Sequence, residues 1–344
     1  MARRVLEAEL LASQGMTPQP MGPAKAVELF KEFKLHKTFS GIFSLQFNYN
    51  GDTLAVGFGA GGIQTYATNT GTLCKELRSC RQGGYAIMVL RFHPKDPNIL
   101  YAASTEGHIY VLNISTGETL ATLEEMGNEI NCMDFSVDGY NFATGGKDLA
   151  IRIYETKSNK VVKTYPGFGS GGSVFEKNQV GNTMRVFSLK FHPNNQYIFV
   201  SGGWDNHVKI WDIRDNDGIK RNISGPHICG DSIDLMENRI LTGQWTALHA
   251  LQEFNYTTGA LSREIKYPNT DGAFLYASLY SNEDTVFAGG SGTNRAELIE
   301  ISTNRHIGGH QMPAPVHALD SACQGRILAA GGAGASFVIL KVLE

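Results

Sequence analysis

The 344-residue sequence has no long apolar run and no excess of charge of one sign. No run approaches the roughly 18 apolar residues that a membrane-spanning helix needs. Glu7 and Glu9 stand where a signal peptide would carry its apolar stretch. Thirty basic and thirty-three acidic residues give a net charge of −3, so the chain offers no positive field to nucleic acid or to an anionic membrane. We therefore expect no membrane insertion and no general nucleic-acid binding.

Cysteine is also scarce. Of the five cysteines, only Cys74 and Cys80 lie close together in the sequence. Because their number is odd, they cannot all pair in disulfide bonds within the chain. Reduced thiols in the cytosol explain this pattern most simply. The expected compartment is the cytoplasm, with the nucleus or a cytoskeletal assembly such as a cilium as alternatives.

What the sequence does contain is one pattern of three short apolar runs that returns along almost the whole chain. In each copy an alternating run is followed by a polar turn, a run that ends in small residues, a turn with Gly or Asp, and a third run. Such alternation is typical of antiparallel strands with two unlike faces. Seven copies align on the residue that closes the first run: Phe47, Phe92, Phe135, Phe191, Leu235, Tyr280 and Ser321.

The spacing of these anchors indicates a β-propeller. Successive anchors are 45, 43, 56, 44, 45 and 41 residues apart, and all but one interval match the roughly 40–45 residues of a four-stranded blade. The long interval contains a Gly-rich segment, 163–185, which predicts a surface loop inserted between the third and fourth repeats. The predicted fold is all-β, a closed seven-bladed propeller over residues 35–344.

A propeller must close because a single blade cannot bury both faces of its sheet. The segment LHKTFSG, 35–41, is predicted to join the last repeat, 316–341, as its fourth strand. Residues 1–34 then form an N-terminal extension. In it, AKAVELFKEFKL places Ala26, Phe30 and Phe33 on one helical side. This spacing predicts a short helix that packs on the rim of the ring or docks on a partner.

The fourth copy contains SGGWDNHVKIWDI, with Trp211 and Asp212 ending the third run and Asp205 in the turn before it. This motif resembles the signature of the WD-repeat (WD40) family, and the resemblance covers roughly residues 35–344. It implies that Asp205, and Asp148 in the third copy, hold their turns by hydrogen bonds.

Several copies depart from the family pattern. Tyr154 replaces the Trp in the third copy, and the second has Gly107 and Tyr110. The last three copies lack the Trp-Asp dipeptide, and no copy has the family's Gly-His before its first strand. The hydrogen-bonded tetrad of typical blades is therefore expected to be incomplete, while the topology is retained.

Three features suggest chemistry, and each has a structural explanation. Residues 57–62 match G-x-G-x-x-G, but a strand-like GIQTYA follows where a nucleotide site needs a helix. The pairs His93-Pro94 and His192-Pro193 fall in different copies, which favours turns over a shared metal site. Ser201, Asp205 and His207 lie within one hairpin, where a catalytic arrangement is unfavourable.

The expected function is therefore a non-catalytic scaffold for protein–protein interactions, without cofactor or metal. The alternative is a propeller enzyme or small-molecule binder that uses the central channel. Such a site needs converging carboxylates or His from several blades. The inner positions are predicted to be Ala, Gly, Ser and Thr, which disfavours this alternative.

The resemblance implies that partners bind the face made by the turns between second and third strands and the approaches to first strands. Tyr, Trp and Arg are the residue types enriched in binding hot spots. The predicted partner-binding residues are Tyr85, Glu106, Arg185, Trp204, Trp245 and Arg295. Trp204 and Trp245 occupy matching turns, and the alternative for each is a ring folded back over its own blade. We expect a monomeric propeller that binds one or more proteins in a larger complex.

Overall fold

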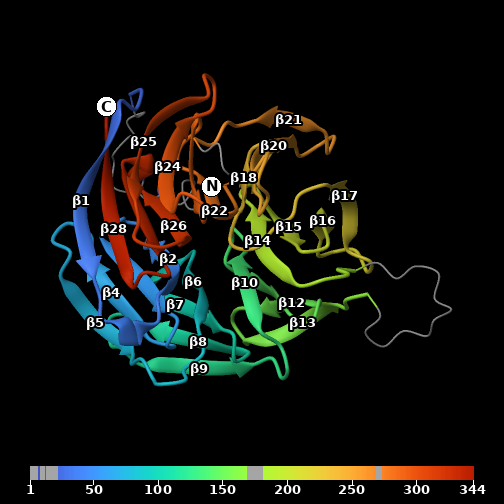
Figure 1. Cartoon of the computed structure of the whole chain (residues 1–344). Helices are drawn as coiled ribbons and strands as arrows, with labels where there is room; N and C mark the ends of the chain where they lie inside the picture. Colours follow the sequence, from blue (N-terminus) through green and yellow to red (C-terminus); the bar gives the residue numbers. More distant parts are fainter. Residues whose placement is uncertain (1–6, 8–11, 13–21, 169–180, 269–272) are drawn as a thin grey trace.

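The computed structural model describes residues 7, 12, 22–168, 181–268 and 273–344. In this part of the chain, 28 strands form seven antiparallel four-stranded sheets around a central channel (Figure 1). The same residues include two short 3-10 turns, η1 (Lys37–Phe39) and η2 (Cys323–Gly325). No helix within the described ranges is long and apolar enough to cross a membrane. The predicted all-β, seven-bladed propeller is confirmed.

The first four blades follow the chain in order, each as a four-stranded meander. Blade 1 contains β2 (Ile42–Phe47), β3 (Thr53–Phe58), β4 (Ile63–Ala67) and β5 (Leu73–Arg78). Blade 2 contains β6 (Ile87–His93), β7 (Asp96–Ser104), β8 (His108–Asn113) and β9 (Thr119–Glu124). Blade 3 contains β10 (Ile130–Phe135), β11 (Asn141–Gly146), β12 (Ile151–Glu155) and β13 (Lys160–Tyr165). Blade 4 contains β14 (Val186–His192), β15 (Asn195–Gly203), β16 (His207–Asp212) and β17 (Ile219–Ser224).

The last three blades complete the ring. Blade 5 contains β18 (Ile233–Met236), β19 (Arg239–Gly243), β20 (Leu251–Asn255) and β21 (Leu261–Glu264). Blade 6 contains β22 (Leu275–Tyr280), β23 (Thr285–Gly290), β24 (Arg295–Glu300) and β25 (Arg305–Gln311). Blade 7 contains β26 (Val316–Ala322), β27 (Ile327–Gly332), β28 (Ser336–Leu343) and, as its outer strand, β1 (Ala26–Lys34).

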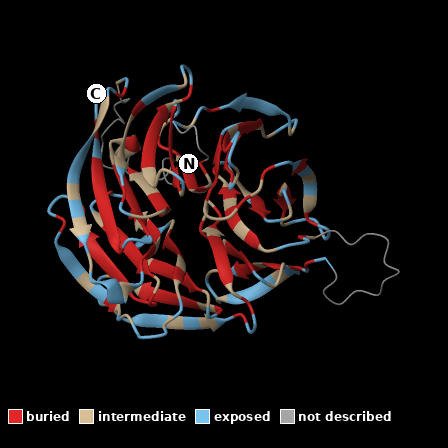
Figure 2. Cartoon of the chain, viewed as in Figure 1, coloured by how far each residue is buried: buried red, intermediate tan, exposed pale blue. Residues whose placement is uncertain are grey.

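The first strand of each blade is innermost, because first strands of neighbouring blades contact one another around the channel. Each of the seven sequence anchors lies in the first strand of its blade. Figure 2 shows the resulting gradient, with buried inner strands and exposed outer strands. The repeat spacing therefore located the blades correctly.

Small residues at the ends of the second strands make room for the next blade. A Cβ atom on Gly57 would lie 2.8 Å from Cγ2 of Ile87, and one on Gly202 would lie 2.6 Å from Cδ1 of Ile233. Real Cβ atoms do not approach so closely, so a larger residue would push the blades apart. These small residues therefore face the neighbouring blade.

The ring is closed by an N-terminal strand, as predicted, but at a different segment. β1 pairs antiparallel with β28, from Ala26 opposite Leu343 to Lys34 opposite Ser336. The predicted closing strand, 35–41, instead contains the η1 turn. The N-terminal extension therefore contributes its last residues to blade 7.

The predicted helix over 24–35 is wrong, and a β-bulge explains the error. The register shifts between Leu29 and Lys31, so Phe30 has no paired residue on β28. A bulge moves the following side chains to the other face of the strand. Because the bulge interrupts the two-residue alternation of the strand, Ala26, Phe30 and Phe33 fall at intervals that are also typical of one side of a helix.

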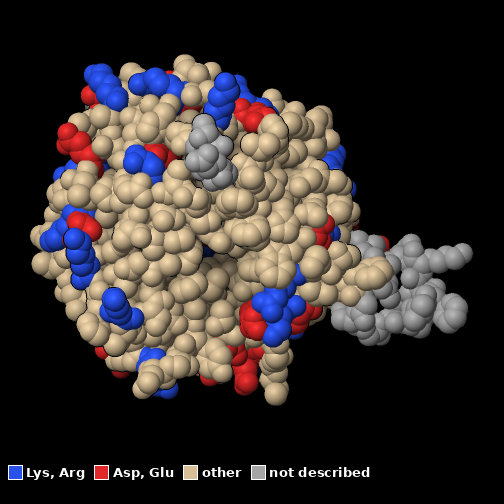
Figure 3. Space-filling model, viewed as in Figure 1, with Lys and Arg blue, Asp and Glu red and all other residues tan. Residues whose placement is uncertain are grey.

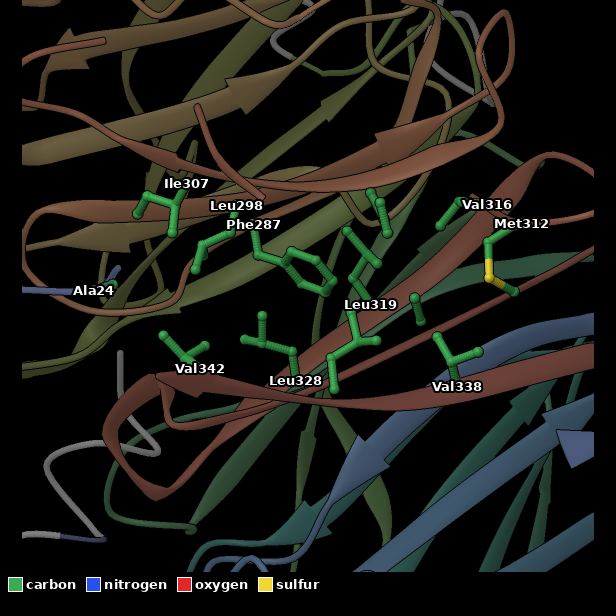
Figure 4. Packing of buried hydrophobic residues seen from close by; sticks show 14 residues of the cluster. Ala24, Phe287, Leu298, Ile307, Met312, Val316, Leu319, Leu328, Val338 and Val342 are labelled. Carbon is green, nitrogen blue, oxygen red and sulfur yellow. The ribbon is translucent and has the colours of Figure 1, made fainter. Parts of the chain in front are cut away.

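Closure buries an apolar cluster between blades 6 and 7 (Figure 4). Phe287 and Leu298 from blade 6 pack with Val338 and other residues of blade 7, and Ala24, just before β1, belongs to the same cluster. On the blade 1 side, the ring of Phe33 stacks on Phe337 with centroids 4.1 Å apart. Both faces of the closing blade are therefore covered.

The connection between blades 3 and 4 is shorter than predicted. β13 ends at Tyr165, which is buried and whose hydroxyl donates to the carbonyl of Asp212 at 3.1 Å. Residues 163–165 therefore belong to the blade, and the connection starts at Pro166. Residues 169–180 of the predicted surface loop lie outside the described residues.

The strand register also corrects the alignment of the second copy. Leu112, not Tyr110, lies opposite Leu100 in β7, which is the place of the motif Trp in blade 4. By the same register, Glu106 and not Gly107 takes the place of the turn Asp. The second copy is therefore further from the WD pattern than its Tyr suggested.

Candidate partner-binding surface

In an antiparallel blade, the turn between the second and third strands and the loop leading to the next first strand lie at the same end. We call this end of the ring the turn face, and the end with the other two turns the opposite face. All six predicted partner-binding residues lie in or directly beside turn-face segments: Tyr85, Glu106, Arg185, Trp204, Trp245 and Arg295. Their placement on one face is a consequence of the topology, and their role stays a prediction.

Arg185 and Trp204 lie together beside blade 4. The guanidinium of Arg185 is 5.8 Å from the centroid of the Trp204 ring, which also packs on Phe187 at 5.0 Å. The indole N–H of Trp204 donates to Sγ of Cys229 at 2.9 Å. These contacts fix the ring while leaving 36% of the residue exposed.

Trp245 is held in a similar way at blade 5. Its backbone N–H donates to the carbonyl of His227 at 2.9 Å, and its ring lies 5.1 Å from that of Phe274. It is 40% exposed. Nδ1 of His227 lies 2.7 Å from Oδ1 of Asn206, which belongs to the Trp204 turn. The two tryptophan turns are thus joined by hydrogen bonds.

We call this group the aromatic patch, and it consists of Arg185, Phe187, Trp204, His227, Trp245 and Phe274. Both tryptophans make hydrogen bonds and ring contacts within the protein. Each nevertheless keeps over a third of its surface exposed. Rigid, half-exposed aromatic side chains give large contact area at low entropic cost. The patch can therefore bind an apolar or aromatic segment without rearranging.

The other predicted residues are not part of this group. Tyr85 is exposed in the loop before blade 2, and Glu106 lies 3.2 Å from Nδ1 of His108 in its own blade. Arg295 pairs with the buried carboxylate of Glu297. The structure thus brings together three of the six residues and leaves the others dispersed around the face.

Two exposed apolar residues of the same turns were not predicted. Met184 precedes Arg185, and Leu248 lies in the Trp245 turn, where its carbonyl accepts a hydrogen bond from the Thr246 hydroxyl at 2.9 Å. Met and Leu are not among the residue types enriched in binding hot spots, so nothing in the sequence led to their selection. Both extend the apolar area beside the aromatic patch. Figure 3, a view along the channel, shows charged side chains mostly toward the outside of the visible face.

Glu129 is the main charged group next to the patch. Its carboxylate accepts hydrogen bonds from Lys147 at 2.5 Å and from Arg185 at 2.6 Å. The Lys147 hydrogen bond lowers the pKa of Glu129, which keeps the carboxylate ionised. Two cations around one carboxylate leave this edge of the patch with one surplus positive charge.

The signature residues of blades 3 and 4 hold turns and strands. Oδ1 of Asp205 accepts the His207 N–H at 3.3 Å, and Oδ1 of Asp148 accepts the Ala150 N–H at 3.2 Å. Trp211 is fully buried, and its indole N–H donates to Ser201 at 2.8 Å. Ser201 is therefore engaged as a structural acceptor.

Asp212, the second residue of the dipeptide, points to the opposite face. Its carboxylate binds Arg214 through Nε at 2.9 Å and Nη2 at 2.7 Å. The hydrogen bonds from Arg214 lower the pKa of Asp212.

Blade 3 contains a buried network that the sequence did not reveal. Oε1 of Glu125 accepts from the hydroxyl of Tyr154 at 2.9 Å and from Thr144, while Oε2 accepts from Arg152 at 3.1 Å and Asn128 at 2.6 Å. Burial and the neighbouring Glu125 raise the pKa of Tyr154. A carboxylate from the loop before blade 3 thus supplies acceptors where the family's His is missing.

The central channel opens on the opposite face as a cavity of about 110 Å³. The expectation of Ala, Gly, Ser and Thr around the channel is wrong, because those residues end the second strands and face the next blade. The charged residues that line the cavity are Glu7, Arg91, Asp134, Lys190, Asp231, Asp234 and Asp320.

Most of these polar side chains tie one blade to the next. In four blades the residue before the anchor accepts the N–H of the following blade's anchor: Gln46 from Phe92 at 2.5 Å, Asp134 from Phe191 at 2.8 Å, Asp234 from Tyr280 at 3.0 Å and Asp320 from Phe47 at 2.7 Å. The carboxylates thus have a structural use.

Arg91 crosses the channel. Its Nη2 lies 2.7 Å from Oδ2 of Asp231 in the loop before blade 5, and its Nε lies 3.2 Å from Oδ1 of Asp134 in blade 3. Burial opposes the ionisation of Asp231, but Arg91 outweighs it and holds the pKa of this carboxyl below its usual range. The channel is therefore bridged by charged groups.

The sequence features that suggested nucleotide or metal binding have structural explanations in the fold. Residues 57–62 comprise the end of β3 and the turn that leads to β4, so a strand follows them, not a helix. Nδ1 of His93 accepts the Lys95 N–H at 3.1 Å, and Nδ1 of His192 accepts the Asn194 N–H at 3.2 Å, so both hold turns. In the described ranges, no group of three or more His, Cys, Asp or Glu is arranged to hold a metal ion.

These observations define a seven-bladed β-propeller in which blades 3 and 4 have a Tyr or Trp in the third strand and an Asp in the turn before it. Comparison with known proteins matches the WD domain, G-beta repeat family at residues 117–155 and 174–212. The first match runs from β9 to β12, so one sequence repeat combines the outer strand of one blade with three strands of the next. The chain therefore contains repeats of the WD40 family.

Similar proteins include a ribosome biogenesis protein WDR12 homolog from Culex quinquefasciatus, 29% identical over 35% of this chain and 25% of that protein. Transcription factor unc-37 from Caenorhabditis elegans is 24% identical over 73% of this chain and 37% of its own length. Nuclear distribution protein nudF from Aspergillus niger is 27% identical over 40% of this chain and 32% of its length. The matched regions span well under two thirds of these relatives.

Proposed function

We propose that this protein is a non-catalytic scaffold that binds partner proteins through the aromatic patch on its turn face. The observation that carries the proposal is the pair of half-exposed tryptophans, Trp204 and Trp245, held in two hydrogen-bonded turns. Hot-spot residues are most often Trp, Tyr and Arg in such preorganised positions. Arg185, at the edge with surplus positive charge, favours a partner segment that combines apolar and acidic residues.

A rigid propeller suits this role because its turns do not need to order on binding. WD40-repeat proteins work generally in protein complexes, and the names of the relatives refer to ribosome biogenesis, transcription and nuclear distribution. We propose that this chain also acts in a multiprotein assembly, as a monomeric propeller. Its proposed compartment is the cytoplasm, and imaging of a fluorescent fusion distinguishes this from the nucleus or the cytoskeleton.

The channel fits a small-molecule site less well. Its cavity measures about 110 Å³. Ligand pockets usually measure about 300–1,000 Å³. The described carboxylates of the channel are also committed to neighbouring blades and to Arg91.

The test is affinity capture with the wild-type chain and a Trp204→Ala/Trp245→Ala variant. Removing a hot-spot side chain costs about 2 kcal/mol or more, which weakens binding by roughly 30-fold. We expect the variant to lose partners that the wild type retains. Circular dichroism and a thermal melt establish that both are folded.

The matched control is Tyr140→Ala/Tyr197→Ala. These aromatic residues are 73% and 37% exposed and lie on the opposite face, so the control removes similar side chains elsewhere. It should keep the partners. Equal capture by all three folded proteins would contradict the assignment of the turn face.

A further inference from the structure

The chain enters blade 5 through an irregular segment, residues 225–231, which we call the entry loop. β18, the first strand of this blade, has four residues, whereas the first strands of the other six blades have six or seven. Those six strands each contain a β-bulge near their start, while β18 pairs with β19 only from Ile233 onward and has no bulge. The entry loop therefore lacks the strand pairing that fixes the same place in the other blades.

Both tryptophan turns of the aromatic patch are bonded to the entry loop. The indole N–H of Trp204 donates to Sγ of Cys229 at 2.9 Å, and the backbone N–H of Trp245 donates to the carbonyl of His227 at 2.9 Å. Nδ1 of His227 also lies 2.7 Å from Oδ1 of Asn206 in the Trp204 turn. The positions of both indole rings therefore depend on where the entry loop lies.

Two residues hold the entry loop from inside the ring. Ile228 is fully buried among residues of blades 4 and 5, and its N–H donates to the carbonyl of Gly203 at 3.1 Å. Asp231 ends the loop, and its carboxylate reaches into the channel. Oδ2 of Asp231 lies 2.7 Å from Nη2 of Arg91, and Oδ1 accepts the Ser188 hydroxyl at 3.4 Å. The strongest of these contacts comes from across the channel, because Arg91 belongs to blade 2.

Arg91 is itself fixed independently of the loop. It is 7% exposed, its Nε donates to Oδ1 of Asp134 at 3.2 Å, and its Nη1 donates to the carbonyl of Leu90 at 2.9 Å. Hydrogen bonds between charged groups are short and directional, and the guanidinium group is planar and rigid. The other cation near Asp231, Lys190, is farther away at 3.9 Å. Arg91 therefore offers the Asp231 carboxylate a fixed place to bind.

We propose that Arg91 is a positioning residue of the aromatic patch: it holds Asp231 across the channel and, through the entry loop, sets the positions of Trp204 and Trp245. Segments with little strand pairing open locally more often than the core. The ion pair suppresses this opening, and a preorganised surface loses less entropy on binding. The inference rests on the proposed function only for the consequence in binding, since the positioning is a property of the free chain.

The first test is amide hydrogen exchange of the free, full-length Arg91→Met variant, measured by NMR. The amide of Trp245, bonded to the entry loop, should exchange at least tenfold faster than in the wild type. The amide of Trp204 is the matched control, because it makes the equivalent bond in blade 4, to the carbonyl of Arg185 at 3.1 Å. Its exchange should not change, whereas a general loss of stability would accelerate both amides. Unchanged exchange of the Trp245 amide would overturn the proposal.

Asp231→Asn removes the same ion pair from the other side and leaves Arg91 bonded to Asp134, which keeps the test available if Arg91→Met does not fold. It should accelerate exchange of the Trp245 amide by a similar factor. The double variant should exchange no faster than either single variant, because both substitutions remove one interaction. Effects that multiply in the double variant would contradict the proposal.

A matched control variant is Arg152→Met in blade 3. Arg152 is also a partly buried arginine between two carboxylates, those of Glu125 and Asp148, but neither carboxylate belongs to the entry loop. This variant should leave exchange of the Trp245 amide as in the wild type. Acceleration equal to that in Arg91→Met would show that loss of any buried arginine loosens the loop, and would overturn the proposal.

Partner capture by Asp231→Asn separates the positioning from the proposed function. Faster exchange of the Trp245 amide together with at least tenfold weaker capture supports both. Faster exchange with unchanged capture supports the positioning and contradicts binding at the aromatic patch. Unchanged exchange overturns the positioning, whatever the capture shows.

Discussion

The carboxylate of Glu125 accepts four hydrogen bonds in blade 3, from Thr144, Tyr154, Arg152 and Asn128. It lies in the loop between blades 2 and 3, outside the three apolar runs on which the seven copies are aligned. Sequence comparison among the copies therefore had no signal for it. The hydrogen bonds to Thr144, Tyr154 and Arg152 also depend on contacts with residues far from Glu125 in the sequence.

Replacing Glu125 by Ala should destabilise the protein by about 3–5 kcal/mol, because removing one partner of a buried ion pair leaves the other groups unsatisfied. Urea unfolding measures the change in free energy. Glu118 is exposed and lies at the other end of β9 from Glu125. Glu118→Ala should therefore cost less than about 0.5 kcal/mol. Equal losses in both variants would show that the buried network contributes nothing particular.

At the scale of elements, β1 shows how a strand can have the sequence pattern of a helix. The bulge between Leu29 and Lys31 changes the face on which side chains lie. Phe33 then stacks on Phe337, while the Phe30 ring remains exposed beneath the ammonium group of Lys341. Bulge positions depend on the partner strand, which is more than 300 residues away in the sequence, so local periodicity does not reveal them.

Substitutions of Phe33 and of Phe30 distinguish a closing strand from a helix, because the two structures predict different losses of stability. In the strand, Phe33→Ala should cost about 3 kcal/mol by leaving a gap between blade 7 and blade 1, where the ring contacts Phe337 and Tyr66. Phe30→Ala should cost less than about 1 kcal/mol, since its ring is exposed. A helix lying on the rim would use both rings equally. Thermal or urea unfolding of the two variants therefore tests the closing strand directly.

At the scale of the whole molecule, the number of blades and their boundaries followed from the sequence because each blade repeats the same inner strand. Phe47, Phe92 and the other anchors lie in corresponding places, all but Ser321 are buried core residues, and their spacing is set by blade size. The channel lining was not predictable in the same way. Its residues vary from Gln46 to Arg91 to Asp134, and the small residues expected there lie one strand further out.

The turn face follows from topology once the blades are known, and Arg185, Trp204 and Trp245 lie on that face. That these residues form one patch could not be predicted from the sequence, because the contact between Asn206 and His227 joins turns of two different blades. The ring thus has two distinct ends. One presents aromatic side chains, and the other contains the charged mouth that Glu7 enters.

The most direct measurement is hydrogen exchange of the chain alone and bound to a partner captured by the wild type. Binding at the aromatic patch predicts slower exchange in 203–207, 225–230 and 244–250, with no change in the opposite-face turns 136–140 and 213–218. Slower exchange confined to the opposite-face turns, or no difference anywhere on the turn face, would contradict the account.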